Sequence, residues 1–218
     1  MTTAPFLDKK GFLFDFDGVV CDSEKFHHLA WQNVAGLLGV PFSREDYVPF
    51  QSTGRRVVIT ELCRRARLPF TEEIFTRLSE KKSMFFAEAI RGVGKKDLIP
   101  GVEDYLLFLT RHEKRLAVAS SASTAEEMLD RLGLSPFFSV VVDGKRGLPK
   151  KPDPAVFDAA RLGLGLTVDD CIVFEDSPAG VQAGLNGGFA VCGIGENVQG
   201  FDIPVFSDFC EIINGRLS

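Results

Sequence analysis

The sequence predicts an α/β protein, a doubly wound parallel sheet into which an all-helical domain is inserted. Short apolar runs typical of strands alternate with segments of helical periodicity, which is the pattern of βαβ units and a parallel sheet. One gap breaks this alternation, because about seventy residues after the first predicted strand contain only helical patterns. That length is too great for a single crossover, so we expect a separate domain there.

The predicted strands are short apolar runs bounded by turn residues. The first, Gly11–Phe16, is almost continuously apolar and ends among acidic residues. The other predicted strands are Arg115–Ser120, Ser139–Asp143, Cys171–Glu175, Ala190–Ile194 and a weaker one near Pro204–Phe206. The helical patterns between strands are Val102–His112, Thr124–Leu132, Pro154–Leu162 and Ala179–Asn186.

The inserted domain is expected over residues 21–91, which leaves residues 1–20 and 92–218 for the α/β core. Its helical patterns are Glu24–Leu38, Gly54–Ala66 and Thr71–Ile90. Glycine and proline separate these patterns, in Gly39-Val40-Pro41 and Leu68-Pro69, where a helix is expected to end.

Composition places the chain among ordinary globular proteins. The 218 residues are 45% hydrophobic and 25% charged, and the net charge of −5 argues against a nucleic-acid partner. Five scattered cysteines form no CxxC pair, which fits a reducing compartment better than a disulfide framework. No apolar stretch has the length of a membrane span and no signal peptide is visible, so we expect a cytoplasmic protein with no membrane partner.

Polar residues follow four of the predicted strands. In open α/β sheets, ligands bind beyond the carboxyl ends of the strands, so these side chains are expected to converge. Carboxylates, hydroxyls and a lysine together suit a divalent cation and a phosphate group. In the order of the strands they follow, the residues are Asp15 and Asp17, Ser120 and Ser121, Lys151, and Glu175 and Asp176.

The chemistry of these groups suggests roles for them. Magnesium prefers oxygen ligands, and Asp15 and Asp176 are its natural carboxylates, with the backbone carbonyl of Asp17 as a third donor. With the metal bound, one acid can attack phosphorus while the other protonates the leaving oxygen and then activates water. Ser120 and Lys151 would hold the phosphoryl oxygens.

Each of these motifs alone also has a purely structural explanation. The Asp-x-Asp pair suits a turn, and the serines from Ser120 onward suit helix capping. Lys151 could be a solvated lysine in a turn before a helix, and Glu175-Asp176 could cap the helix that begins near Pro178. The order and placement of all four motifs favour a site.

Together the four motifs resemble those of the haloacid dehalogenase (HAD) superfamily of phosphotransferases, specifically members with a helical cap inserted after the first strand. Asp15-Phe16-Asp17-Gly18-Val19 resembles the first motif and Ser120 the second. Lys151, in Lys-Pro-Asp-Pro, resembles the third, and the segment from Glu175 to Gly180 the fourth. The resemblance covers essentially the whole chain.

The resemblance implies a role for each acidic residue. Asp15 would be the nucleophile, Asp17 the general acid and base, and Asp15 with Asp176 would bind Mg²⁺. Glu175 would either bind the metal itself or contact a residue that binds it. The superfamily's dehalogenases carry a different residue at the position of Asp17, so dehalogenation is not expected.

The start of the inserted domain resembles the cap of β-phosphoglucomutases, where a histidine matching His27 cooperates with the second aspartate. The mutases also have a cap arginine that holds the distal phosphate, and Arg55 or Arg56 is the candidate for it here, in a loop of different residue order. Lys82 lies near the position of a cap lysine. The alternatives are that His27 packs in the helical bundle and that the arginines and Lys82 lie on solvated helix faces.

The functional prediction is magnesium-dependent phosphoryl transfer through an aspartyl-phosphate at Asp15. The expected reaction is hydrolysis of small sugar phosphate monoesters by a monomer. One alternative is isomerisation of hexose 1-phosphate to hexose 6-phosphate, as in β-phosphoglucomutases. A second alternative, from another class, is a non-catalytic metal-binding interaction module on the same fold.

Overall fold

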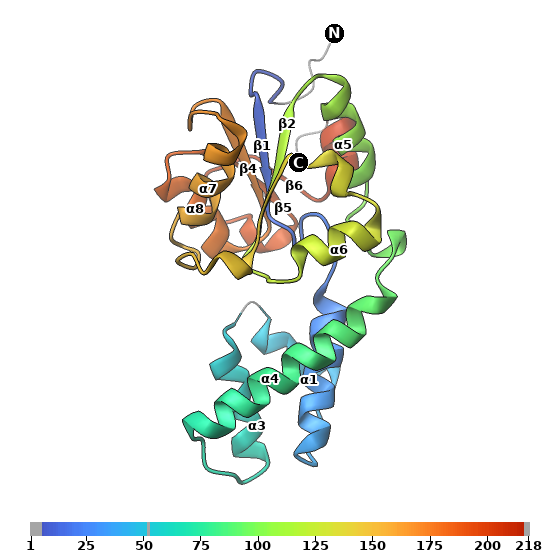
Figure 1. The fold of residues 1–218 in the computed structure, drawn as a ribbon, viewed down its shortest axis with the longest axis vertical. Helices are drawn as coiled ribbons and strands as arrows, with labels where there is room; N and C mark the ends of the chain where they lie inside the picture. Colours follow the sequence, from blue (N-terminus) through green and yellow to red (C-terminus); the bar gives the residue numbers. More distant parts are fainter. Residues whose placement is uncertain (1–5, 52, 216–218) are drawn as a thin grey trace. The chain divides into compact units, whose positions relative to one another are not determined.

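The computed structural model describes residues 6–51 and 53–215, which form two compact units. One unit comprises the described residues up to Asp22 and from Gly94 onward, and the other comprises those between Ser23 and Val93. Both junctions lie two residues beyond those expected from the sequence, where the insert was placed at residues 21–91. Figure 1 shows a sheet with helices in the first unit and helices alone in the second.

The first unit is built on a six-stranded parallel sheet of order β3-β2-β1-β4-β5-β6, which confirms the predicted α/β class. The strands are β1 (Gly11–Phe14), β2 (Arg115–Ala119), β3 (Val140–Val142), β4 (Cys171–Glu175), β5 (Ala190–Ile194) and β6 (Val205–Phe206). β1 lies between β2 and β4, with Phe14 in register with Val118 on one side and Phe174 on the other. The carboxyl ends of β1, β2 and β4 therefore lie side by side.

Helices cover both faces of this sheet, which explains why its central strands are apolar throughout. The helices of the unit are α5 (Val102–Arg111), α6 (Ala125–Leu132), α7 (Ala155–Leu164), α8 (Pro178–Asn186) and α9 (Phe209–Ile213). In Figure 1, α7 and α8 lie on one side of the sheet and α5 on the other. The short α9 was not predicted, because five residues are too few to show helical periodicity.

The two faces of the sheet have different cores. On one face, aliphatic side chains such as Leu13 and Val173 pack against α7 and α8. On the other face, aromatic rings meet, with Phe14 stacked on Phe174 at 5.0 Å between ring centroids and Tyr105 of α5 5.8 Å from Phe174. Alternate side chains of β1 thus enter different cores, and both hold this central strand in place.

The second unit is a small helical bundle with its own core. Its helices are α1 (Glu24–Leu37), α2 (Arg44–Tyr47), α3 (Arg55–Arg65) and α4 (Glu72–Ala89). Trp31, Ile59 and Leu78 lie in the core of this bundle. Thr71 caps α4 through its side chain, and the four-residue α2 begins with a capping box of Ser43 and Asp46. The three longer helices were expected, whereas α2 was not.

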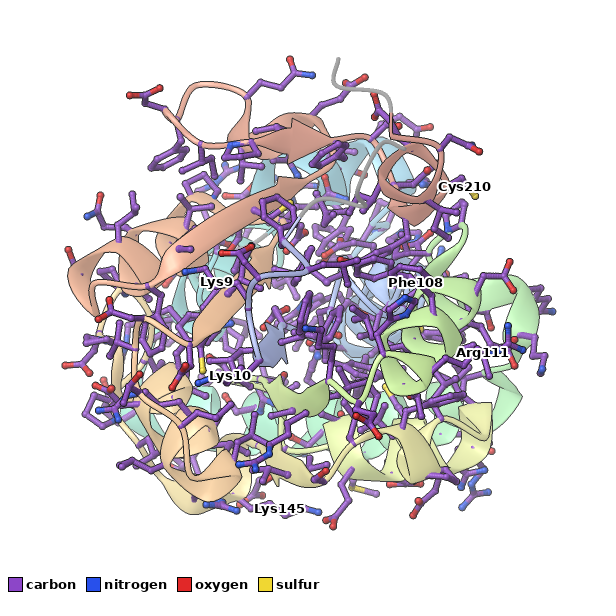
Figure 2. The ribbon with its side chains drawn as sticks, turned by 90° about the horizontal axis from the view of Figure 1, so that it is seen from above. Lys9, Lys10, Phe108, Arg111, Lys145 and Cys210 are labelled. Atoms are coloured by element: carbon purple, nitrogen blue, oxygen red, sulfur yellow. The ribbon has the colours of Figure 1, made fainter. Side chains whose placement is uncertain are left out.

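All five cysteines are free thiols. Cys210, labelled in Figure 2, is exposed, and the other four are buried. Among the described residues, no helix has both the length and the apolar character to cross a membrane.

Candidate active site

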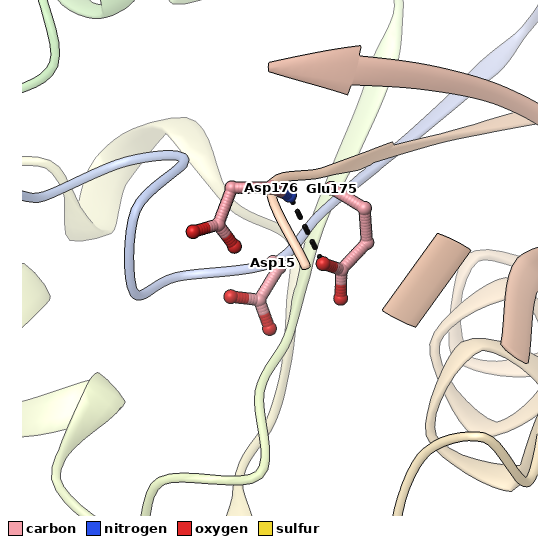
Figure 3. A group of neighbouring side chains, drawn as sticks. All are labelled: Asp15, Glu175 and Asp176. Atoms are coloured by element: carbon pink, nitrogen blue, oxygen red, sulfur yellow. Dashed lines mark hydrogen bonds between the residues drawn. The ribbon is translucent and has the colours of Figure 1, made fainter. Parts of the chain in front are cut away.

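Three carboxylates meet at the carboxyl ends of the neighbouring strands β1 and β4. Asp15 directly follows β1, Glu175 is the last residue of β4, and Asp176 comes next. Each can offer one oxygen such that all three oxygens lie within 4.8 Å of one another (Figure 3). The pairing of β1 with β4 continues into this cluster, since the Asp15 N–H donates to the carbonyl of Phe174 at 3.0 Å. The fold therefore brings together residues that are distant in sequence.

Lys151 adds a buried cation to this cluster. Its Nζ contacts Oδ1 of Asp15, lies 2.6 Å from Oε1 of Glu175 and donates to the carbonyl of Ala119 at 3.2 Å. An ammonium group has three protons, so these three acceptors satisfy it. The side chain of Lys151 is only 9% exposed, which rules out the alternative of a solvated lysine.

Glu175 is buried completely and both of its carboxylate oxygens are in use. Oε1 faces Lys151, while Oε2 accepts hydrogen bonds from the Asp176 N–H, the Ser177 N–H and the Ser177 hydroxyl at 3.0, 3.1 and 3.0 Å. From the sequence, Glu175-Asp176 could also be explained as a helix cap. Its contact with Lys151 places it in the cluster.

Asp176 lies against the glycine of the Asp15-Phe16-Asp17-Gly18 turn. A β-carbon at residue 18 would stand 2.1 Å from Oδ2 of Asp176, and Gly18 has a φ of +82°. Glycine alone suits both the close approach and this backbone angle. Asp17 is partly exposed in the same turn, which the Gly18 N–H closes by donating to the carbonyl of Cys21 at 2.8 Å.

Burial shifts the proton equilibria of the cluster. It raises the pKa of Asp15 to about 8 and that of Asp176 to about 9, with a further increase from the neighbouring acids and an opposing effect of Lys151. For Lys151, burial lowers the pKa, but the charges of Asp15 and Glu175 outweigh it and the net change is upward. Because burial favours the neutral forms of Asp15 and Asp176, a bound cation would favour ionisation of all three carboxylates beside the single ammonium.

Ser120 and Ser121 follow β2, at the same edge of the sheet. Ser120 is 2% exposed, its N–H donates to the carbonyl of Val142, and its Oγ accepts from the Ala122 N–H at 3.0 Å. The Ser120 hydroxyl keeps its own proton to donate. The side chain of Ser121 is exposed, and the Ser121 carbonyl lies against Gly144, where a β-carbon would be 2.4 Å away.

In the helical unit, His27 of α1 and Lys82 of α4 form a close pair, with 2.7 Å between Nδ1 and Nζ. Burial, followed by the charges of Lys82 and Arg55, lowers the pKa of His27 to about 3. The imidazole is therefore neutral, with Nδ1 accepting from Lys82 and the ring proton on Nε2. His27 also stacks on Phe86 at 4.3 Å, and Lys82 is 4% exposed, so Lys82 does not lie on a solvated face.

The two candidate arginines at the start of α3 have different surroundings. Arg56 forms two hydrogen bonds with Glu72, at 2.7 and 2.9 Å, and lies over the rings of Phe70 and Phe75. Arg55 is exposed and donates to the carbonyl of Ser79 and the hydroxyl of Ser83, at 3.1 and 2.9 Å. Arg56 is thus occupied by an ion pair within the fold, whereas the described contacts of Arg55 are to neutral groups.

Comparison with known proteins gives consistent results. Residues 9–188 match the family model described as haloacid dehalogenase-like hydrolase. The chain is 29% identical to a β-phosphoglucomutase of Bacillus subtilis over 200 residues, 90% of this chain and 88% of that protein. It is 30% identical to a phosphorylated carbohydrates phosphatase of Thermotoga maritima, over 81% of this chain and 80% of that protein.

A solved structure of β-phosphoglucomutase from Clostridium difficile matches with a TM-score of 0.79 and 25% identity, over 92% of each chain. The matched family segment contains all four motifs, from Asp15 to the residues after Glu175. These relatives are phosphatases and phosphomutases. This chain is therefore an enzyme of the same type. The chain belongs to the haloacid dehalogenase-like hydrolases, in the β-phosphoglucomutase-like subgroup.

Proposed function

We propose that this protein is a magnesium-dependent phosphatase of small phosphorylated sugars that works through an aspartyl-phosphate on Asp15. The observation that carries the proposal is the contact of buried Asp15 with Lys151, beside Asp176, at the carboxyl end of β1. Relatives described as a phosphorylated carbohydrates phosphatase and a fructose-1-phosphate phosphatase support the substrate class.

The donor set of the cluster fits magnesium. Carboxylate oxygens are the ligands this ion prefers, and a divalent cation would stabilise the ionised forms of buried carboxylates that one ammonium does not balance. Asp15 and Asp176 would hold the ion, with the Asp17 carbonyl as a further donor and Glu175 as a ligand or supporting partner. The bound ion would neutralise charge on the phosphoryl oxygens.

The residues of the chain account for each bond made and broken. A carboxylate oxygen of Asp15 attacks phosphorus, the bond from phosphorus to the sugar oxygen breaks, and Asp17 gives that oxygen a proton. Water then attacks the phosphorus of the aspartyl-phosphate, Asp17 takes its proton, and inorganic phosphate leaves as the bond to Asp15 breaks. Lys151 and the Ser120 hydroxyl stabilise the phosphoryl oxygens throughout.

The helical unit offers a set of groups suited to a sugar phosphate. We propose that His27, Lys82 and Arg55 contribute to substrate recognition, because they combine a neutral imidazole with two cations. Arg55 is preferred over Arg56, since Arg56 already holds a carboxylate. Cytosolic location and a monomeric state stay predictions, the first supported by five free thiols.

The second candidate reaction is the isomerisation of hexose 1-phosphate to hexose 6-phosphate. In that reaction a sugar hydroxyl, rather than water, attacks the aspartyl-phosphate. The relatives described as β-phosphoglucomutase and the His27–Lys82 pair favour this candidate. The non-catalytic module has no such support, because the relatives are enzymes and all four motifs are present here.

Phosphorus NMR separates the two reactions in one tube. Purified protein is given Mg²⁺, β-glucose 1-phosphate and a trace of the 1,6-bisphosphate, with Asp15→Asn as the matched control. Phosphatase activity yields inorganic phosphate, whereas conversion to glucose 6-phosphate with little inorganic phosphate identifies a mutase. If wild-type protein leaves this sugar, fructose 1-phosphate and an aryl phosphate all intact, the proposed function is wrong.

A further inference from the structure

The carboxylate of Glu175 is held asymmetrically. Oε1 meets the ammonium of Lys151, and Oε2 accepts three hydrogen bonds from the residues that follow it. Two of these donors are backbone N–H groups, which any sequence would supply. The third is the hydroxyl of Ser177, 3.0 Å away, so a side chain takes part in setting the orientation of Glu175.

Ser177 has a second contact, as the residue that caps α8. Its Oγ accepts from the Gly180 N–H at 3.1 Å while its proton goes to Glu175. Aspartate would cap a helix equally well, but an ionised aspartate has no proton to donate. Capping alone therefore does not require the hydroxyl that this position carries.

The first turn of α8 also closes on the other oxygen of Glu175. A β-carbon at residue 180 would stand 1.8 Å from Oε1, so Gly180 gives the carboxylate the room it occupies. The Ser177 hydroxyl holds Oε2 and the Gly180 backbone borders Oε1. Rotation of the carboxylate is thereby restricted from both sides.

We propose that Ser177 is a positioning residue that acts through Glu175 on Lys151. The Ser177 hydroxyl holds Oε2, which directs Oε1 to Lys151, whose Nζ in turn contacts Oδ1 of Asp15. The consequence for the reaction rests on the proposed role of Asp15 as nucleophile. Without the hydroxyl, Oε2 keeps only its two backbone donors, so the carboxylate is held less firmly and the position of Lys151 against Asp15 changes.

This role is tested by measuring kcat and KM with p-nitrophenyl phosphate at saturating Mg²⁺. The variants are Ser177→Ala, Ser177→Thr and Asp208→Ala. Ser177→Ala is expected to lower kcat by about 10- to 100-fold with little change in KM. Loss of a side chain that orients a residue of a metal site typically has an effect of this size. Ser177→Thr keeps the hydroxyl and restores kcat. Asp208→Ala is the matched control: it removes the cap of α9, where Oδ1 accepts from the Glu211 N–H at 3.0 Å, and it leaves kcat unchanged.

Two further readouts need no turnover. The ¹H–¹⁵N signal of the Lys151 ammonium, identified by its loss in Lys151→Met, should shift in Ser177→Ala and stay in place in Asp208→Ala. Calorimetric titration with Mg²⁺ alone should give the same Kd, within about threefold, for Ser177→Ala and wild type, because the charge of the cluster is unchanged.

The inference is overturned if Ser177→Ala retains wild-type kcat, if Ser177→Thr fails to restore it, or if the Lys151 signal does not move. Should Ser177→Ala not fold, Ser177→Asp keeps the cap without the donated proton, and wild-type kcat in that variant overturns the inference too. A wild-type protein without phosphatase or mutase activity would instead refute the proposed function, and the Lys151 signal would still decide the role of Ser177.

Discussion

Gly18 and Asp176 touch so closely that a single added carbon would displace the carboxylate: a β-carbon at residue 18 would lie 2.1 Å from Oδ2. Gly18 comes from the turn after β1 and Asp176 from the end of β4. The position of one proposed magnesium ligand thus depends on the absence of a side chain in another part of the chain.

Gly18→Ala should therefore weaken magnesium binding. We expect Kd for Mg²⁺ to rise by about 10-fold or more, because Asp176 must move, in addition to a strain of about 1–2 kcal/mol from the left-handed backbone. Calorimetric titration measures Kd and urea unfolding measures the strain. Gly39→Ala is the control: its φ is +67° and no atom lies within 4 Å of its β-carbon position, so it should show the strain alone. Equal Kd values for both variants would contradict the prediction.

Removal of Lys151 should affect both stability and catalysis. Lys151→Met leaves Asp15 and Glu175 buried without their cation, and breaking such a buried pair costs about 3–5 kcal/mol. We expect a loss of that order in the free energy of unfolding of metal-free protein, measured in urea, and no detectable kcat. Added Mg²⁺ should recover part of the stability but not kcat. A variant with wild-type kcat would show that Lys151 has no part in the reaction.

His27 should make the stability of the protein depend on pH. Its pKa is lowered to about 3 in the folded state, against 6.5 in an unfolded chain, so between these values the unfolded chain binds the extra proton. The free energy of unfolding should accordingly rise with pH across this window, by at most about 1.4 kcal/mol per pH unit from this residue. His27→Gln removes this contribution. Urea unfolding at pH 4.5, 5.5 and 7.5 gives the free energy of unfolding of both proteins. If this free energy rises no more steeply with pH in the wild type than in the variant, the prediction is wrong.

Arg55 and Arg56 form a natural pair of test and control. Arg55→Ala should raise KM for a sugar phosphate about 10-fold or more, because a guanidinium that holds only neutral groups is available to an anion. Arg56→Ala should leave KM unchanged, since its partner is Glu72. Initial rates over a range of substrate concentrations give both values, and an effect in Arg56→Ala alone would reverse the assignment.

The sheet was predictable from the sequence because its central strands are buried on both faces and read as unbroken apolar runs. The cluster of carboxylates and Lys151 could be predicted from the same pattern, since Asp15 and Glu175 lie at the carboxyl ends of predicted strands and Lys151 comes after one. What could not be predicted depends on contacts between distant residues. Lys82 looks like one charge in a polar helix, and only the fold places it against His27.

The short helices and the second contact of Ser177 show the same limit. α2 and α9 have four and five residues, too few for a periodic signal, and are recognisable mainly by the caps Ser43 and Asp208. Ser177 before Pro178 is a helix-start signal in the sequence, but the donation to Glu175 is visible only in three dimensions.

The strand order has a consequence for the growing chain. β1 is synthesised first and ends at the centre of the sheet, yet its neighbour β4 comes only after β2 and β3. The contact between Lys151 and Asp15 joins residues 136 positions apart. Most of the chain must therefore be synthesised before Asp15 can meet all its partners, and a polypeptide that stops short of β4 lacks Glu175 and Asp176 of the cluster.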